Sequence, residues 1–479
     1  MLYLNLNKVA IALKINRLLN NYMITRIEVN GFKSLNNFSL DLNKGLNILV
    51  GPNGAGKTNI ILFFEFLSLS CTEHIANSIS KVGGAGAVFK KISFDEYEKE
   101  FSFKVYGTKK IQKRGKSSET EYLSYEYSAT ILNSFDLDNI FYSKQSFKFA
   151  KNQNFDFDHR GKDDWDFALD LDISEDNKFN ISNFKIEKDI ANNNQHIINS
   201  KSKSTSKINK NFVKEFLENG DLSHNCIINF LFTILERKTI DIIRDLKGGE
   251  TFNIVPSKVK EVEDAANPPG IKKDGSGLAA TLYAIKNERS KESYLDYPFF
   301  IFTHDIDRKY KKESLQNIVD YLKLANNTIE NLDVINDPFD NRLVVKININ
   351  ADEYNSVLPL SAMSDGTIKW ITIITAILTS NSIFSIEEPE NFLHPWMQAE
   401  IVKIMRNHIS NGNEEACVIM TTHSESLLNY SEPNELILVE MIGGQTKAIR
   451  IDDIEIIKSE ISNSGLGLGH FYFSNSLFN

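Results

Sequence analysis

The segment GPNGAGKT at residues 51–58 constrains the fold more than any other part of the chain. It matches the pattern G-x-x-x-x-G-K-[S/T], whose glycines let backbone N–H groups approach phosphate oxygens where a Cβ would block them. Such a loop requires a buried strand before it and a helix after it. The apolar run LNILV at residues 46–50 and the apolar residues within 58–70 meet that requirement. We therefore predict a strand, a phosphate-binding loop and a helix over this stretch.

The polar residues of this loop indicate its ligand. We expect ATP as the nucleotide and Mg²⁺ as the cofactor, with Lys57 neutralising phosphate charge and Thr58 binding the metal ion. The helix that begins at Lys57 would add the positive end of its dipole. Asn53, Gly54 and Gly56 complete the expected nucleotide-binding set. A glycine turn without a ligand is the alternative interpretation.

A second apolar strand, predicted over residues 382–386, ends at the adjacent acids Glu387 and Glu388. Neighbouring side chains of a strand point to opposite faces, so the two carboxylates can divide two tasks. Glu387 would support Mg²⁺, directly or through water, and Glu388 would polarise the attacking water as a general base. Two solvated acids at a strand end are the alternative.

Two further motifs point to the γ-phosphate. His423 follows an apolar strand predicted over residues 416–421, where its side chain could sense that phosphate, although a lone histidine is often only structural. Ser364 and Gly366 in the string SDGT open a predicted helix with small polar groups, which suits an anion. Because residues 51–58 already bind a phosphate, we expect this helix to contact ATP bound by another subunit. A simple helix N-cap is the alternative.

The remaining pattern divides the chain into segments. Residues 23–97 form the first part of an ATPase head, and alternating, aromatic-rich runs predict an antiparallel β lobe over 98–174. A polar, low-complexity loop and helical spacing predict a variable loop and helical insertion over 175–340. Strands alternating with helices over 341–479 indicate the second part of the head, which completes a parallel core sheet. Residues 1–22 are an uncertain N-terminal extension, and whether they belong to the native start stays open.

Periodicity predicts individual elements in the later segments. Helices are expected over 212–246, 278–286, 314–331, 367–379 and 396–409, strands over 342–350 and 356–360, and a β-rich stretch at the end of the chain.

Composition excludes several classes of protein. The formal net charge of −9 lacks the basic signal of a protein that coats nucleic acid, so any DNA contact has to be local. The three cysteines show no CxxC spacing, which argues against a disulfide framework or a zinc site and favours the cytoplasm. We expect neither a signal peptide nor a membrane span. One basic cluster is a candidate contact for nucleic acid or a partner, with a solvated loop as the favoured alternative: Lys109, Lys110, Lys113, Arg114 and Lys116.

The order of the motifs NGFKSL, GPNGAGKT, SDGT, EEPENFLHP and TTHS resembles the ABC/SMC-like head of the RecF and OLD (overcoming lysogenization defect) group of AAA-labelled ATPases. The segment DGSGLAATLY at residues 274–283 is similar to one found in stand-alone OLD-like members. The resemblance covers about residues 24–95 and 270–475. It implies a Mg²⁺-dependent ATPase with an α/β fold: a P-loop NTPase of ABC/SMC-head type, whose mixed core sheet carries an antiparallel β lobe and a helical insertion.

The resemblance also implies roles for particular residues. It assigns Lys57 and Thr58 to Walker A, Ser364 and Gly366 to the signature that acts in trans, Glu387 and Glu388 to Walker B, Asn391 and His394 to the D-loop, and His423 to the switch histidine. Two departures stand out: the signature reads SDGT in place of SGGQ, and the first Walker B acid is Glu in place of the usual Asp. Neither Gln112 nor Gln145 has the context of a Q-loop glutamine.

The resemblance favours a head that dimerises around two nucleotides, as a homodimer or a higher even oligomer. It would control a separate effector protein, such as a nuclease or toxin, in anti-phage or anti-plasmid defence. A RecF-like DNA-repair ATPase is the main alternative, and a nuclease in its own right is a weaker one, with His304 and Asp305 as the nearest approach to a metal pair. We expect no Toprim nuclease domain within the 56 residues after His423.

Two other classes fit less well. Transporter ATPase subunits place their signature much nearer the P-loop than Ser364 lies, and chromosome-organising proteins need sustained heptads that this chain lacks. The sequence names neither the effector, the trigger nor the preferred nucleic acid.

Overall fold

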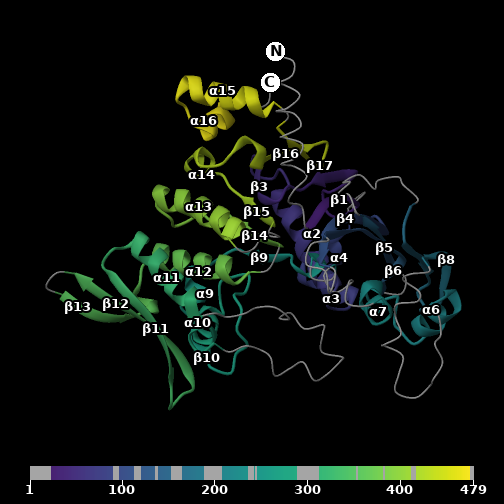
Figure 1. The fold of residues 1–479 in the computed structure, drawn as a ribbon, viewed down its shortest axis with the longest axis horizontal. Helices are drawn as coiled ribbons and strands as arrows, with labels where there is room; N and C mark the ends of the chain where they lie inside the picture. Colours follow the sequence, from purple (N-terminus) through teal and green to yellow (C-terminus); the bar gives the residue numbers. More distant parts are fainter. Residues whose placement is uncertain are drawn as a thin grey trace. The chain divides into compact units, whose positions relative to one another are not determined.

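The computed structural model describes residues 23–89, 97–112, 120–134, 139–152, 164–187, 208–235, 242, 245–288, 312–351, 354–380, 383–411, 417–451 and 453–474. The chain forms two compact units (Figure 1). Unit 1 comprises Met1–Lys44, Asn53–Gly249 and Val439–Ile449, and unit 2 comprises Gly45–Pro52, Glu250–Leu438 and Arg450–Asn479. The boundary therefore passes through the predicted phosphate loop. The predicted extension 1–22 and the pair His304 and Asp305 lie outside the described residues.

A seven-stranded antiparallel sheet dominates unit 1, in the order β2-β1-β4-β5-β6-β7-β8. Apolar and polar residues alternate along β4, so that Phe101, Phe103 and Val105 are buried on one face. The predicted antiparallel β lobe is confirmed, and its sheet also contains β1 and β2, the first two described strands of the chain. The strands are β1 (Met23–Asn30), β2 (Phe38–Asp41), β4 (Glu100–Gln112), β5 (Thr120–Ser134), β6 (Asn139–Asn152), β7 (Phe167–Ile173) and β8 (Phe179–Ile186).

Aromatic packing ties the first long helix to this sheet. The ring of Phe32 lies 5.6 Å from that of Phe63 on α2 and 5.5 Å from that of Phe101 on β4, both in edge-on geometry. Such pairs contribute about 0.5–1.5 kcal/mol beyond their buried area. The described helices of unit 1 are α2 (Lys57–Ser70), α3 (Ile75–Lys81), α4 (Ala85–Val88), α6 (Lys210–Leu217) and α7 (Ile227–Ile234).

The prediction of a single helix over 212–246 is wrong, because a loop separates α6 from α7. Polar side chains of the sheet region bind the backbone of that loop. Asn177 Oδ1 accepts hydrogen bonds from the N–H groups of Leu222 (2.8 Å) and Ser223 (3.1 Å), and Gln145 Oε1 accepts one from the N–H of Ile227 (2.8 Å). These tertiary hydrogen bonds outweigh the helical spacing of the apolar residues. Gln145 is buried in this contact, in keeping with its lack of a Q-loop context.

The core sheet of unit 2 is parallel along β16-β3-β15-β14-β9, and β17 follows β16 at one edge. Its strands in unit 2 are β3 (Gly45–Val50), β9 (Glu250–Phe252), β14 (Ile383–Glu387), β15 (Cys417–Thr421) and the start of β16 (Leu436–Ile442), whereas the rest of β16 and nearly all of β17 (Gln445–Arg450) are assigned to unit 1. Continuous apolar runs such as CVIMT are typical of parallel strands that are covered on both faces. The predicted α/β class and the strand, loop and helix at residues 46–70 are confirmed.

A second sheet in unit 2 is antiparallel and contains β10 (Glu263–Asp264), β11 (Ile329–Asp337), β12 (Arg342–Ala351) and β13 (Tyr354–Pro359). Helix α10 (Leu278–Lys286) packs on β11 and β12, and α11 (Lys312–Ala325) packs on β11 (Figure 1). The helix predicted over 314–331 ends early, at Ala325. Asn326 Oδ1 accepts hydrogen bonds from the N–H (3.0 Å) and hydroxyl (2.7 Å) of Thr328, which turns the chain into β11.

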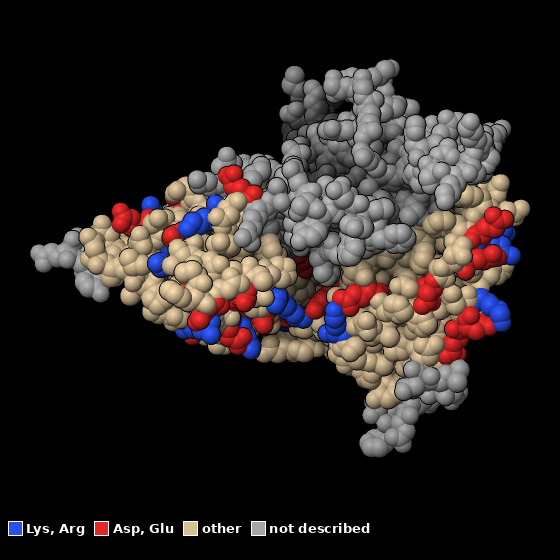
Figure 2. Space-filling view, turned by 90° about the horizontal axis from the view of Figure 1, so that it is seen from below, with Lys and Arg blue, Asp and Glu red and all other residues tan. Residues whose placement is uncertain are grey.

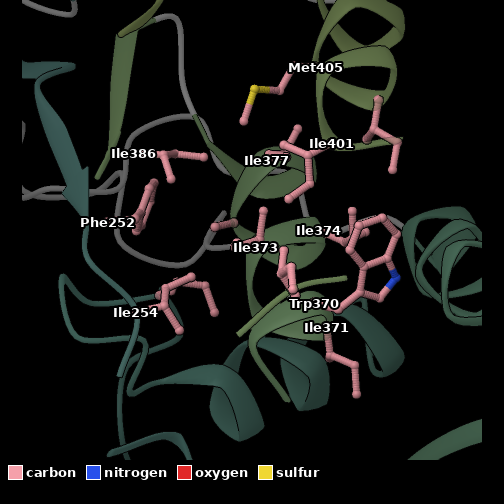
Figure 3. Packing of buried hydrophobic residues seen from close by; sticks show 14 of the residues in the cluster. Phe252, Ile254, Trp370, Ile371, Ile373, Ile374, Ile377, Ile386, Ile401 and Met405 are labelled. Atoms are coloured by element: carbon pink, nitrogen blue, oxygen red, sulfur yellow. The ribbon is translucent and has the colours of Figure 1, made fainter. Parts of the chain in front are cut away.

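The core of unit 2 surrounds α12 (Asp365–Thr379). Figure 3 shows Trp370 and four isoleucines of this helix packed among residues of β9, β14 and α13. The indole N–H of Trp370 donates to the carbonyl of Tyr321 (2.9 Å), so the buried ring leaves no unsatisfied donor. The other helices are α9 (Pro256–Val259), α10 (Leu278–Lys286), α11 (Lys312–Ala325), α13 (Pro395–Asn411), α14 (Glu425–Asn429), α15 (Ile454–Ser464) and α16 (Leu468–Phe473).

The β-rich ending is only partly correct, because α15 and α16 follow β17. Helix α16 packs on α14 through Gly469, whose N–H donates to Asn429 Oδ1 (2.8 Å). A Cβ at Gly469 would lie 2.6 Å from the carbonyl oxygen of Glu425, so this approach requires glycine.

The three cysteines are buried free thiols, and Cys71 Sγ and Cys226 Sγ lie 3.9 Å apart. Within the described parts of the chain, the helices are too short or too polar to span a bilayer. Acidic and basic side chains are interspersed on the described surface in Figure 2. Of the predicted basic cluster, Lys109 and Lys110 belong to β4, whereas the other three residues lie outside the described residues.

Candidate nucleotide site

The phosphate loop leaves β3 at Val50, and helix α2 begins at Lys57. Gly54 and Gly56 adopt φ angles of 80° and 99°, a region that favours glycine. Helix α2 has no side-chain cap and no acidic residue in its first turn. Its first N–H groups are therefore suited to an anion. Lys57 is 7% exposed, and Thr58 follows it in the same turn.

A hydroxyl pair supports the end of this loop within unit 1. Ser34 Oγ and Thr446 Oγ1 lie 2.6 Å apart, and Asn59 Nδ2 donates to Ser34 Oγ (2.7 Å). A Cβ at Gly56 would lie 1.9 Å from Thr446 Oγ1. The motif NGFKSL therefore has a physical role, since Ser34 links the loop to β17. Sequence analysis missed Thr446, which carries no motif of its own.

Three parallel strands of unit 2 end at one edge of the core sheet. Glu387 pairs in register with Thr421, and Thr421 pairs with Leu49. The N–H of Thr422 also donates to the carbonyl of Leu49 (3.3 Å). The start of the phosphate loop, the acidic pair and the segment of His423 therefore leave the sheet together, as the predicted Walker B and switch motifs require. Residues 53–58, the rest of the expected phosphate-binding loop, belong to unit 1.

Glu388 has a strained backbone that its neighbours hold in place. Its φ angle is 41°, in the left-handed region, which costs a residue with a side chain about 1–3 kcal/mol. Its N–H donates to both oxygens of Thr421 (3.1 and 3.2 Å), and its carbonyl accepts from Lys369 Nζ (3.0 Å). Asn391 Nδ2 donates to Glu388 Oε2 (2.9 Å). Contacts from three segments thus orient the predicted general base.

A third acid, Glu390, positions the segment of His423. Its Oε1 accepts hydrogen bonds from the hydroxyl of Thr422 (2.9 Å) and the N–H of His423 (2.7 Å). Gln398 supports the same region by donating to the carbonyl of Leu393 (2.9 Å) and accepting from Ser424 Oγ (2.5 Å). Sequence analysis missed both residues, although the repeated acid in EEPE was a readable signal for Glu390.

The predicted signature forms the N-terminus of α12. Ser364 Oγ accepts a hydrogen bond from the N–H of Thr367 (3.2 Å), and Ser364 and Asp365 are exposed. A Cβ at Gly366 would lie 2.7 Å from the carbonyl oxygen of Phe392 in the D-loop stretch, so glycine is required for this approach. Phe392 itself is 64% exposed and has a φ angle of 68°. His394 is also exposed.

Lys369 connects the signature helix to Glu388 and was not predicted. It is 2% exposed, and its Nζ lies 5.8 Å from the centroid of the Phe392 ring. Burial lowers the pKa of Lys369 to about 8, against the opposing effect of Glu390 and Glu388. The protein therefore keeps a desolvated cation hydrogen-bonded to the backbone carbonyl of the predicted general base.

The oxygen donors of this region fit Mg²⁺, which prefers carboxylates, hydroxyls and phosphate oxygens. The half-buried Glu387 of unit 2 offers such a carboxylate. When bound, the ion would neutralise charge that develops on the β- and γ-phosphate oxygens.

Comparison with known proteins supports a nucleotide-hydrolysing domain. Residues 260–429 match the family described as "AAA domain, putative AbiEii toxin, Type IV TA system". The chain is 36% identical over 107 residues to chromosome partition protein Smc of Methanocaldococcus jannaschii, covering 21% of this chain and 9% of that protein. It is 33% identical over 78 residues to DNA replication and repair protein RecF of Glaesserella parasuis (16% and 22%). It is 30% identical over 84 residues to Septu protein PtuA of Bacillus thuringiensis (18% and 18%).

The alignments span less than a quarter of these relatives. Among solved structures, the Smc head bound to the C-terminal winged-helix domain of ScpA aligns with a TM-score of 0.46 and 12% identity, covering 91% of this chain and 99% of that one. An Smc head from Pyrococcus furiosus bound to the C-terminal domain of ScpA aligns with a TM-score of 0.45 and 13% identity (92% and 99%). Residues 260–429 thus match an AAA domain, and shorter stretches of the chain are similar in sequence to SMC and RecF proteins.

Proposed function

We propose that this chain binds and hydrolyses Mg²⁺-ATP as an ABC/SMC-type head. The observation that supports it most is the strained Glu388, which Thr421, Lys369 and Asn391 hold at the edge where β3, β14 and β15 end. Strained residues that their surroundings fully determine are typical of active sites.

The proposed roles follow from the order of the motifs and from the family resemblance. Glu388 polarises the attacking water, Glu387 and Thr58 hold Mg²⁺, and His423 contacts the γ-phosphate. The loop residues Asn53, Gly54, Gly56 and Lys57 bind the phosphates. Glu390 acts through His423 and is a positioning residue.

Exchange of Glu388 for glutamine tests the assignment. Glu388→Gln should still bind ATP but turn over at least ~100-fold more slowly, because the amide cannot accept the proton. Glu400→Gln is the matched control, since Glu400 pairs with Lys403 (2.6 Å) on the exposed side of α13. Near-normal turnover in Glu388→Gln, measured by phosphate release, would remove Glu388 from the mechanism.

We also propose that two such heads close on two nucleotides. The exposed Ser364 and the tightly packed Gly366 present the N-terminus of α12 for a phosphate of a second subunit. A mixture of Lys57→Ala and Ser364→Arg chains should then recover activity in one composite site. Activity in a strictly monomeric wild type, with no recovery in the mixture, would exclude this arrangement.

The proposed biological role is control of a separate effector, such as a nuclease or toxin, in cytoplasmic defence against phage or plasmids. The OLD-like motif order and the similarity to Septu protein PtuA support this proposal. The three free thiols are in keeping with a reducing compartment. A DNA-repair role is the second candidate, favoured by the similarity to RecF. Tight, salt-sensitive DNA binding that stimulates ATP turnover, without any effector, would favour repair.

A further inference from the structure

Two histidines and an aspartate that belong to none of the nucleotide motifs meet in unit 1. His74 lies in the connection between α2 and α3, and Asp221 and His224 lie in the loop between α6 and α7. The N–H of Ile75 donates to the carbonyl of His224 (2.9 Å), which joins the two segments through their backbones. His74 occupies the N-cap position of α3 but makes no capping hydrogen bond through its side chain. Its imidazole is therefore not engaged in helix capping.

The three side chains lie within reach of one metal ion. Their donor atoms all lie within 4.8 Å of one another. Asp221 Oδ2 is 3.0 Å from His224 Nδ1 and 4.0 Å from His74 Nε2, and the two imidazole rings stack 5.4 Å apart at 11°. An ion with bonds of about 2.0 Å in tetrahedral geometry needs donor atoms about 3.3 Å apart. Asp221 Oδ2 and His224 Nδ1 are within about 0.3 Å of that spacing, whereas the exposed His74 would have to turn its ring out of the stack and bring Nε2 about 0.7 Å closer to Asp221.

Further hydrogen bonds orient His224 as a metal ligand requires. Asn139 Nδ2 donates to Glu175 Oε1 (3.1 Å), so that Asn139 Oδ1 faces His224 Nε2 at 3.2 Å. This oxygen can accept the Nε2–H and leave the lone pair of Nδ1 directed toward Asp221. A ligating histidine commonly has such an acceptor on its second nitrogen.

Solvent can reach all three side chains. The Ser223 hydroxyl donates to Asp221 Oδ1 (2.8 Å), which leaves Asp221 Oδ2 for a cation. The side chains of His74, Asp221 and His224 are 53%, 40% and 25% exposed. A cation can therefore enter from solvent, and a water molecule can complete its coordination.

We propose that His74, Asp221 and His224 bind one Zn²⁺ ion, which links the α2–α3 connection to the α6–α7 loop. Two imidazole nitrogens and a carboxylate oxygen are a set that Zn²⁺ favours and that Mg²⁺ does not. Residues 74 and 221 are 147 positions apart. The ion would therefore close a long loop and stabilise unit 1 against unfolding. The site is independent of nucleotide chemistry.

Zinc titration of the full chain, stripped with EDTA and without nucleotide, tests the site. A chromophoric chelator serves as competitor, and elemental analysis gives the stoichiometry. The wild type should bind one equivalent of Zn²⁺, and excess Mg²⁺ should not displace it. His74→Ala should bind at least ~10-fold more weakly. Asn139→Ala removes the acceptor of His224 together with the hydrogen bond to Glu175, and should bind roughly 10–100-fold more weakly. His470→Ala removes an exposed histidine in α16 of unit 2 and should match the wild type.

Two further readouts separate a built site from scattered surface binding. Co²⁺ in place of Zn²⁺ should produce visible d–d absorption that His74→Ala loses. Saturating Zn²⁺ should raise the thermal midpoint of the wild type but not that of His74→Ala. Circular dichroism of the metal-free variants checks their folding. If His74→Ala is misfolded, the zinc affinity of Asn139→Ala decides the test. Binding of less than about a tenth of an equivalent, or equal zinc affinity in the wild type, His74→Ala and Asn139→Ala, would overturn the proposal.

Discussion

The buried Lys369 should make the protein less stable than a neutral residue of similar size. Its pKa falls from 10.5 to about 8 because burial disfavours the ammonium ion. At neutral pH the lysine is charged in both the folded and the unfolded state. The difference between these two pKa values means that the buried charge destabilises the folded state by about 3 kcal/mol.

Replacement of Lys369 by methionine removes the charge but also the hydrogen bond to the carbonyl of Glu388. That bond contributes about 1 kcal/mol with a neutral amine, so Lys369→Met should be more stable than the wild type by about 2 kcal/mol at neutral pH. Between the folded pKa and the unfolded pKa, the unfolded wild type binds more protons than the folded one. Its stability therefore rises with pH from about 8 to 10.5. The advantage of the variant should shrink over that range and reverse near its upper end, where only the hydrogen bond of about 1 kcal/mol still separates the two chains.

Urea denaturation at about pH 7 and about pH 9.5 measures the effect, because the difference between the two chains isolates Lys369 from other titrating groups. A Trp165→Phe background leaves Trp370 and Trp396 as the only tryptophans, both in unit 2. ATP turnover should fall in the same variant, since the carbonyl of Glu388 loses its donor. A variant that is less stable at neutral pH, or a pH-independent difference, would refute the argument from desolvation.

Three other substitutions have defined outcomes. Gly56→Ala should abolish ATP binding, measured by fluorescent-nucleotide titration, because its Cβ would collide with Thr446 and its φ angle of 99° disfavours a side chain. Asn391→Ala should lower kcat by roughly 10-fold with little change in KM, since it frees the carboxylate of Glu388, and an unchanged kcat would contradict this. Replacement of the basic cluster by alanine should reduce the slope of log affinity against log salt for any DNA binding by roughly one per lost phosphate contact, and an unchanged slope would favour a solvated loop. The cluster consists of Lys109, Lys110, Lys113, Arg114 and Lys116.

Long elements with a strong period could be predicted from the sequence. The helix after the phosphate loop, α12 and α13 were expected within two residues of their observed ends, because their apolar residues repeat over several turns. The three-residue strand β9 was not predicted, since so short a run carries no period. It exists because it pairs with β14, a partner distant in the chain.

Other misses had local signals that were readable. Asn326 two positions before Thr328 is a turn signal that marks the end of α11. Gly465 stops α15 with a φ angle of 69°, the usual ending of a helix, within a stretch predicted to be β-rich. The domain boundaries drawn from the sequence remain predictions.

The candidate site was predictable where one motif carries the chemistry and unpredictable where the fold assembles it. Glu387 and Glu388 stand side by side in the chain, so their chemistry is visible in the sequence. The sequence around Lys369 does not distinguish it from other helical lysines. Only the structure shows that it is buried and donates to the carbonyl of Glu388. The group of His74, Asp221 and His224 was missed for the same reason, because no metal motif spans so great a separation in sequence.

Lys369 also gives a physical reason for linking the signature to the general base. Its helix begins at Ser364, and Gly366 of the same first turn touches the carbonyl of Phe392. A phosphate at this helix end would attract the ammonium of Lys369, which also binds the carbonyl of Glu388. Because Glu388 is held in a strained conformation, a small shift of that donor can change the direction of its carboxylate. We therefore expect binding of a second subunit's nucleotide to alter turnover through Lys369, and Lys369→Met should uncouple dimer formation from hydrolysis.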